Sequence, residues 1–254
     1  MLIDTHCHIF TEYFEDIDSV IERCNRHGVG MIIVNGTNRR DNEEVLSLVK
    51  KYDIVYGALG IQPEEIDDYT EENLKFIEEH IDDDKILAVG EIGLDYHYEC
   101  DKELQRELFK KQLNIAKKHN KPVIIHSRDC IMETYNILKE TDVKGIMHCY
   151  SGSVEMAEKF IDLGFFLGIG GVSTFKNANK IIDVIKNIPL EYIVLETDAP
   201  YLSPEPYRGK RNEPCNVDVI LEQICRIKGI DYKVVGDITT RNVFRLFDKH
   251  LKLW

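Results

Sequence analysis

The chain has 254 residues, of which 43% are hydrophobic and 30% are charged, and its formal net charge is −13 at pH 7. This composition excludes a disordered or collagen-like chain, and the length suits one large domain spanning residues 1–254. Acidic residues gather between Glu64 and Asp84, so the net charge argues only weakly against nucleic acid as a partner.

Signals for export or membrane insertion are missing from the sequence. The longest uncharged run, Leu163–Phe175, is too short to span a bilayer, and the N-terminus has neither a basic leader nor an apolar segment. The 7 cysteines are scattered without a C-x-x-C pair, which favours reduced thiols over a disulfide framework. We therefore expect a cytoplasmic protein that makes no membrane contact.

Short β-branched runs alternate with segments of helical periodicity along the chain. The expected strands are Leu2–His6, Met31–Asn35, Ile54–Gly60, Ile86–Glu91, Val123–His126, Gly145–Cys149, Phe165–Ile169 and Tyr192–Thr197. The expected helices include Lys102–Asn120, Cys130–Glu140, Ser153–Leu163, Asn177–Asn187, Val217–Ile227 and Val234–Phe247. Asp101 can cap the start of one helix, and Gly164 can close the end of another.

This alternation predicts an α/β fold with a parallel sheet that is buried on both faces. Eight strand–helix units in a chain of this length predict a (β/α)8 TIM barrel. A doubly wound open sheet is the alternative, but it usually carries a glycine-rich phosphate turn after its first strand. The sequence D-T-H-C-H occupies that position here.

Side chains that can bind metals end five of the expected strands or follow them directly. They are His6, His8, Glu91, His126, His148 and Asp198. Because all strands of the barrel end at one mouth, we expect these side chains to converge there. A buried glutamate among imidazoles needs compensating positive charge, and imidazole with carboxylate suits zinc or manganese better than calcium. The sequence therefore predicts a dinuclear site for divalent cations (Zn, Mn or Mg) at the C-terminal mouth.

Neighbouring residues receive weaker interpretations. Alternation along the first strand places Asp4 on the same side as His6, where it either orients a ligand histidine or bonds to backbone. Cys7 and Cys149 each adjoin a candidate ligand in sequence, so both are expected to point away from the site. His97 is left open, and no function is assigned to the remaining histidines His27, His80, His119 and His250.

Six motifs, taken together and in chain order, resemble the TatD family of metal-dependent deoxyribonucleases. They are D-T-H-C-H, G-E-I-G-L-D-Y, P-V-I-I-H-S-R-D, H-C-Y-S-G-S, E-T-D-A-P-Y-L and R-G-K-R-N-E-P. The resemblance implies a TIM-barrel hydrolase of the amidohydrolase superfamily with two metals. It places His6, His8 and Asp198 on one metal and His126 and His148 on the other, with Glu91 bridging. One departure is Gln62, where the family commonly has a histidine that can carry a proton.

The expected reaction is hydrolysis of DNA phosphodiesters by a water activated between two metals, with Glu91 and Asp198 as catalytic residues. The expected substrate-binding residues are Arg128, Gln62, Tyr207, Arg208, Lys210 and Arg211. Because only a few cations lie near the mouth, we expect the substrate to be a short or single-stranded end of DNA rather than a long duplex. A solvated R-G-K-R loop paired with Glu213 is the alternative for that segment.

Two other functions stay open at this point. A related barrel could hydrolyse another ester or an amide, such as D-aminoacyl-tRNA or a cyclic amide. A metal-stabilised scaffold without catalysis is less favoured, because two metals that share six protein ligands keep coordination positions open. We expect a monomer.

Overall fold

A computed structural model describes residues 1–251 and shows a (β/α)8 TIM barrel. Its parallel strands pair in chain order from β1 to β8. They are β1 Leu2–Cys7, β2 Val29–Asn35, β3 Val55–Leu59, β4 Ile86–Asp95, β5 Val123–Arg128, β6 Gly145–Met147, β7 Phe165–Ile169 and β8 Ile193–Leu195. Backbone hydrogen bonds close the barrel where the chain passes β8, from Asp198 N to His6 O at 2.9 Å and from His8 N to Ala199 O at 2.6 Å.

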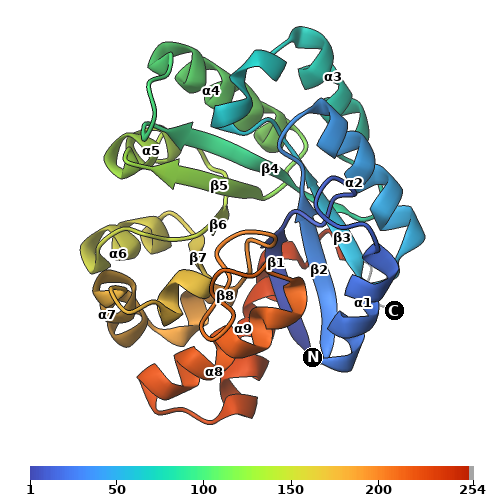
Figure 1. Ribbon diagram of the computed structural model, residues 1–254. Coiled ribbons are helices and arrows are strands. Elements are labelled where there is room, and N and C mark those ends of the chain that lie inside the picture. The colour runs from blue at the N-terminus through green and yellow to red at the C-terminus, as the bar shows by residue number, and fades with distance from the viewer. Residues whose placement is uncertain (252–254) are drawn as a thin grey trace.

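Helices surround the barrel, and the chain passes once around it in sequence order (Figure 1). They are α1 Ile17–Arg26, α2 Arg39–Lys51, α3 Glu71–His80, α4 Lys102–Lys118, α5 Ile131–Leu138, α6 Val154–Asp162, α7 Asn179–Asn187, α8 Val217–Lys228 and α9 Tyr232–Phe247. Asp101 caps α4 by accepting a hydrogen bond from Leu104 N at 3.0 Å, as expected. Gly164 follows α6 with φ +89°, which a side chain would disfavour. None of the helices in the described residues is long and apolar enough to cross a membrane.

The inside of the barrel is apolar at its lower end and polar at its mouth. Ile124, Ile146 and Val194 are buried in the inner hydrophobic cluster, each on a different strand. The side chains two positions further along these strands point the same way, so they reach the mouth. Val243 and Phe247 of α9 belong to the same cluster and cover its lower end. The polar layer therefore lies above a closed apolar layer and faces the mouth.

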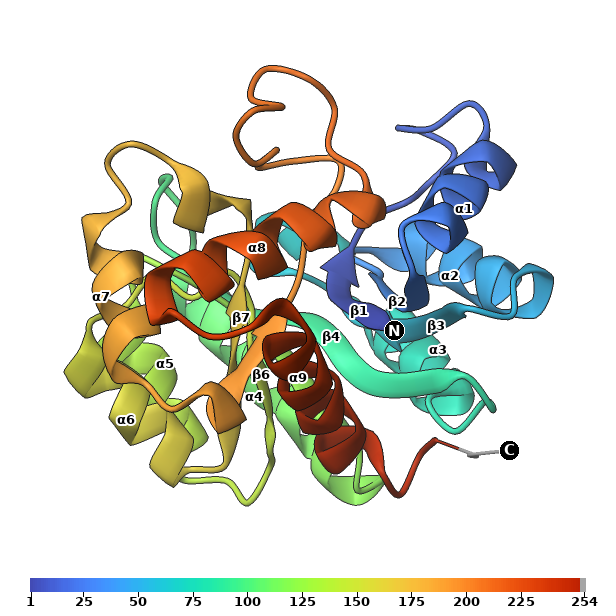
Figure 2. The same cartoon turned by 90° about the horizontal axis from the view of Figure 1, so that it is seen from below.

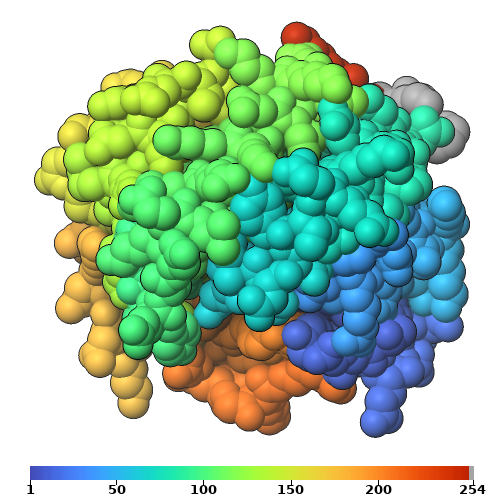
Figure 3. Space-filling view, turned by 90° about the horizontal axis from the view of Figure 1, so that it is seen from above, coloured from blue at the N-terminus to red at the C-terminus, as the bar shows by residue number. Residues whose placement is uncertain are grey.

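The loop between β8 and α8 stands at one end of the molecule. Figure 2 shows this loop, drawn in orange, next to the blue segment that follows β1, while α9 lies nearer the other end. Figure 3 shows the opposite side, where the orange loop again reaches the surface beside the blue segment. Residues from the two ends of the sequence therefore frame one edge of the mouth.

Strand β4 is longer than the sequence predicts. Its expected end was Glu91, but the strand continues to Asp95. Its pairing with β5 is irregular between Val89 and Ile92, so Glu91 lies at a bulge. Bulges redirect side chains, and here the bulge lets the strand present both Glu91 and Asp95 to the mouth.

Candidate metal centre

The structure brings the predicted metal-binding side chains together at the mouth, and one group forms around His6 and His8. Their Nε2 atoms lie 3.0 Å apart. Glu91 Oε2 lies 3.3 Å from His6 Nε2 and 3.5 Å from His8 Nε2. Asp198 Oδ1 lies 3.7 Å and 3.5 Å from the same two nitrogens. These donors therefore face a common centre.

The spacing of this group fits a metal ion. Bonds of about 2.1 Å to a tetrahedral ion place neighbouring donors about 3.4 Å apart. The five separations above run from 3.0 to 3.7 Å and so bracket that value. Two imidazole nitrogens and two carboxylate oxygens are also a donor set that zinc and manganese accept. The residues present thus fit a divalent cation.

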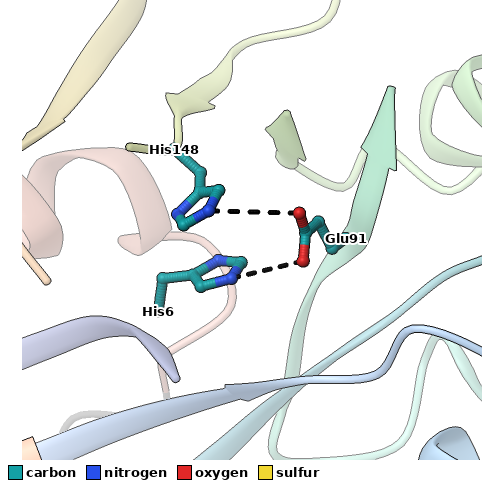
Figure 4. A group of neighbouring side chains, drawn as sticks. All are labelled: His6, Glu91 and His148. Carbon is teal, nitrogen blue, oxygen red and sulfur yellow. Dashed lines mark ion pairs between the residues drawn. The ribbon is translucent and has the colours of Figure 1, made fainter. Parts of the chain in front are cut away.

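A second group forms around the other oxygen of Glu91. His126 Nδ1 lies 2.8 Å from Glu91 Oε1, and His148 Nε2 lies 4.0 Å from the same oxygen. Asp198 Oδ1 lies 3.9 Å from His148 Nε2, so it stands between the groups. The imidazoles of His6 and His148 stack with ring centroids 3.5 Å apart (Figure 4). Glu91 therefore presents one oxygen to each group.

Strand alternation explains how the histidines reach the mouth. His126 follows Ile124 by two positions on β5, and His148 follows Ile146 in the same way beyond β6. Asp198 has φ +57°, a left-handed conformation that a non-glycine residue seldom adopts away from functional sites. The interior pattern of the strands thus continues into the ligands.

Outer partners hold the ligand imidazoles from behind. His126 Nε2 lies 2.9 Å from Asp95 Oδ2, and His148 Nδ1 lies 3.1 Å from Glu196 Oε1. His8 Nδ1 donates to the carbonyl of Asn35 at 2.9 Å. The hydrogen bonds on the far nitrogens of His126 and His8 fix the tautomer and ring orientation of these imidazoles, whereas Glu196 acts on His148 as a neighbouring charge.

Sequence reasoning missed Asp95 and Glu196. Glu196 stands two positions before Asp198, so the alternation rule applied to Asp4 and His6 would have selected it. Asp95 stands four positions after Glu91 on the same face of β4, so the rule would have selected it too if the predicted strand had not ended at Glu91.

Glycine makes room for these outer partners. A Cβ at Gly168 would lie 2.1 Å from Glu196 Oε2, and a Cβ at Gly93 would lie 2.0 Å from the carbonyl oxygen of His126. Gly93 also has φ +148°, which side chains rarely adopt. The close approach of the strands at the mouth therefore depends on these two glycines.

Asp4 does not contact a ligand imidazole. Its Oδ1 accepts hydrogen bonds from His6 N at 3.2 Å and Thr197 N at 2.9 Å, and its Oδ2 accepts from Thr197 Oγ1 at 2.5 Å. Of the two interpretations of Asp4, bonding to backbone is the one that the structure shows. The carboxylate ties the ends of β1 and β8 together and so sets the distance between His6 and Asp198.

Cys149 lies beside Glu196, the outer partner of His148. Its thiol lies in one group with His148 and Glu196, whose ligand atoms are all within 4.8 Å of one another. The strand β6 ends at Met147, and Cys149 has φ +43°, so alternation no longer applies to its side chain. Cys7 does point away, because its Sγ faces the carbonyl of Ile33 at 3.7 Å.

The charges at the centre are strongly coupled. Burial raises the pKa of Glu91, but the surrounding His6, His126 and His148 outweigh burial and hold that pKa well below its ordinary value. Burial lowers the pKa of His126, yet its hydrogen bonds to Asp95 and Glu91 raise it to about 10. The pKa of His148 rises to about 9 despite burial, chiefly through Glu196. Anionic carboxylates thus create a strong demand for positive charge.

The expected substrate-binding residues lie in loops around the mouth, with different surroundings. Arg128 is exposed, with its guanidinium 5.5 Å from the Tyr98 ring, and neither it nor Lys210 has an ion-pair partner among residues 1–251. The Arg208 guanidinium lies 3.8 Å from the Phe175 ring centroid. Arg211 donates to the backbone carbonyl of Tyr13. Arg128, Arg208 and Lys210 therefore keep their donors available for a ligand, whereas Arg211 uses one on Tyr13.

Three further expectations concern the same loops. Glu213 pairs with Arg23 at 2.5 Å, so the expected pairing with the R-G-K-R segment is wrong, although the segment itself is exposed as that alternative expected. Gln62 stands half-buried before the 3₁₀ turn Pro63–Asp68, and Tyr207 is 39% exposed on the loop that follows β8. His97 Nδ1 lies 2.9 Å from Asp129 Oδ2 at the exposed rim, outside both groups of ligands.

A TIM barrel that gathers imidazoles and carboxylates at its C-terminal mouth defines the class of metal-dependent hydrolases with an amidohydrolase-like fold. The family model described as TatD related DNase matches residues 3–248. The chain therefore belongs to the TatD family of metal-dependent hydrolases.

Relatives extend over nearly the whole chain. The uncharacterized metal-dependent hydrolase YabD of Bacillus subtilis (strain 168) is 42% identical, with 97% of this chain and 99% of YabD covered. The crystal structure of the TatD homolog YjjV from Escherichia coli K12 superposes with a TM-score of 0.92 at 33% identity, covering 97% of this chain and 98% of YjjV. A TatD family hydrolase from Entamoeba histolytica gives a TM-score of 0.85 at 26% identity, with 97% of each chain covered.

Proposed function

We propose that this protein is a deoxyribonuclease that hydrolyses phosphodiester bonds at short or single-stranded DNA ends. Two divalent cations per chain would be held by His6, His8 and Asp198 on one side and by His126 and His148 on the other, with Glu91 between them. The DNase description of the matching family supports this substrate.

The position of Glu91 carries the proposal. Its Oε2 faces His6 at 3.3 Å and its Oε1 faces His126 at 2.8 Å, while the side chain is only 3% exposed. The two oxygens of Glu91 thus face different imidazoles, as a carboxylate that bridges two cations requires. A bridging carboxylate is the arrangement that serves paired metals in phosphoryl chemistry.

The cations, when bound, supply Lewis acidity and promote ionisation of a water molecule. The protein supplies the base: Asp198 is 15% exposed, more than Glu91, and its Oδ1 stands 3.5 Å from His8 and 3.9 Å from His148. It is therefore within reach both of the ligands and of a water at the mouth. We assign to Asp198 the acceptance of that water's proton.

Positive charge at the mouth supports a phosphate substrate. Arg128 extends from the end of β5, two residues beyond His126, and its fork of donors matches phosphate oxygens. Lys210 lies on the exposed loop that follows β8. So few free cations suit a contact with a short stretch of backbone rather than with a long duplex.

The test is nuclease activity of the wild type and of Asp198→Asn on oligonucleotides with Mg²⁺ or Mn²⁺, with EDTA as a control. We expect the wild type to shorten single strands, and the variant to bind metal but lose activity by about 10²-fold or more. A variant that keeps near-normal activity contradicts the role of Asp198. A wild type that cleaves an aminoacyl ester or a cyclic amide, but no phosphodiester, contradicts the substrate.

A further inference from the structure

An aromatic side chain that the sequence analysis did not select stands beside the metal centre. Tyr201 follows Asp198 by three residues and is 49% exposed. Its ring centroid lies 6.3 Å from that of His8 and 5.8 Å from that of Tyr13. The ring therefore lies close to the candidate ligand His8. The segments after β1 and β8, which carry Tyr13 and Tyr201, meet at this edge of the mouth (Figure 2).

Hydrogen bonds fix this ring in place. The Tyr201 hydroxyl donates to the Tyr13 hydroxyl at 2.9 Å. Its backbone N donates to Asp198 O at 2.8 Å, and the buried Asn212 side chain donates to Tyr201 O at 2.7 Å and to Thr197 O at 2.8 Å. Tyr201 therefore keeps a constant position relative to the catalytic carboxylate.

This rigidity does not serve the core. The Tyr201 ring is 49% exposed, so much of its apolar surface stays in contact with water. Its backbone is nevertheless held in place by a hydrogen bond from the buried Asn212 side chain. Rigid tyrosines at binding surfaces offer a large flat area at little entropic cost. The ring thus offers a preorganised surface on which a flat ligand at the mouth can stack.

The charges around the ring indicate the chemistry of that partner. Arg211 donates to the carbonyl of Tyr13, and its guanidinium lies 4.8 Å from the Phe14 ring, which places a cation at the base of the pair of tyrosines. Glu12 is the nearby acid, and Arg40 pairs with it at 2.6 Å. A flat ring beside a cation and a metal centre suits a base attached to a phosphate.

We propose that Tyr201, held by Tyr13, forms a stacking subsite for an unpaired nucleobase next to the scissile phosphate. The proposal rests on the proposed function and deepens it, because it makes single-stranded ends the preferred substrate. A base inside a duplex has both faces covered by its neighbours, so only an unpaired or frayed base can present a face to Tyr201.

The subsite differs from the stacking role expected of Tyr207. Tyr207 lies on the same loop and is 39% exposed, but no ring contact or side-chain hydrogen bond holds it within the described residues. A base that stacks on a ring already held in place loses less conformational entropy of the protein than one that stacks on a mobile ring. The base should therefore bind at Tyr201.

The first experiment compares Tyr201→Ala with Tyr201→Phe, which keeps the ring and removes only the hydroxyl. The substrates are a short oligothymidylate and the same oligonucleotide with an abasic terminal residue. We expect Tyr201→Ala to raise KM on the intact strand about 10-fold at a similar kcat, and to leave KM on the abasic strand unchanged. Tyr201→Phe should raise KM on the intact strand less than Tyr201→Ala does, because the ring remains but loses its bond to Tyr13. An equal rise in KM on both substrates would overturn the subsite, because it would reveal a merely structural role.

The second experiment measures binding without turnover. A dinucleotide with terminal 2-aminopurine is titrated into metal-loaded Asp198→Asn protein, and stacking is read as quenching of its fluorescence. We expect quenching that the additional change Tyr201→Ala abolishes. Hydrolysis by the wild type without quenching in Asp198→Asn would overturn the subsite and leave the nuclease standing. Quenching without hydrolysis of any oligonucleotide by the wild type would support the subsite while the proposed function fails.

Discussion

Glu196 Oε1 lies 3.1 Å from Nδ1 of His148, and it also accepts a hydrogen bond from the backbone N of Cys149 at 2.6 Å. The carboxylate is completely buried and so contacts His148 from the side away from the mouth. It thereby turns Nε2 of His148 toward Glu91 and Asp198. One residue that the sequence analysis passed over thus aligns one of the residues that it selected.

Removing the charge of Glu196 should weaken metal binding at the His148 side. We expect Glu196→Gln to lower the affinity for the cation beside His148 about 10- to 100-fold, because the neutral amide no longer favours the correct tautomer of His148. Competition with a chromophoric chelator measures this affinity. The matched control is Glu191→Gln, an exposed position in the turn Leu190–Tyr192, which should bind like the wild type. Equal affinities in both variants would contradict the orienting role.

A methyl group at Gly168 should disturb the same carboxylate. Its Cβ would lie 2.1 Å from Glu196 Oε2, so Gly168→Ala must move Glu196 or the strand β7. We expect the free energy of unfolding to fall by about 1–3 kcal/mol, with weaker metal binding. Gly236→Ala in α9 is the control, because its Cβ would meet only Leu221 and Leu2 at 3.7 and 3.9 Å. That change should be neutral or stabilising by about 0.5–1 kcal/mol in urea unfolding.

The hydrogen bonds of Asp4 that join the ends of β1 and β8 should stabilise the folded protein even when no metal is bound. Thr197→Val keeps the shape of the buried side chain but removes the hydroxyl that donates to Asp4 Oδ2 at 2.5 Å. We expect a loss of about 1–3 kcal/mol in the free energy of unfolding of the metal-free protein. Urea denaturation with EDTA present measures it. An unchanged midpoint would show that the bond from the Thr197 hydroxyl to Asp4 does not contribute to stability.

Metal removal should lower the thermal stability of the folded protein. A ligand that binds only the native state at a concentration about 100 times its Kd adds about 2.7 kcal/mol. We therefore expect the Tm to fall when EDTA is added and to recover when Zn²⁺ or Mn²⁺ is restored in excess. His6→Ala removes one imidazole of the first group, so we expect added metal to raise the Tm of this variant by less than it raises the Tm of the wild type. Equal responses would indicate that the stabilising ion binds elsewhere.

The sequence predicted the barrel and the convergence of the ligands because both follow from simple periodicities. Apolar strands alternate with helices, and the ligands continue the inward-facing positions of strands such as β5. The deviations arise where periodicity fails. Strand β4 continues past the bulge at Glu91 as far as Asp95, and Cys149, with its positive φ, has its thiol beside Glu196.

The contacts within the mouth loops were also beyond prediction. The stacking of Arg208 on Phe175 and the bonding of Tyr201 to Tyr13 join residues from different βα loops. Such pairs depend on how long loops fold over the barrel, which composition and spacing do not determine. The sequence shows that the R-G-K-R segment is positively charged, but it does not show which of these cations have no partner within the protein.

Anomalous diffraction from crystals of the wild-type protein grown with Mn²⁺ tests the central claim most directly. The account predicts two strong peaks per chain, one beside His6 and His8 and the other beside His126 and His148, with an oxygen of Glu91 on each. A single peak, or two peaks of which neither touches Glu91, would contradict the paired centre on which the proposed hydrolysis depends.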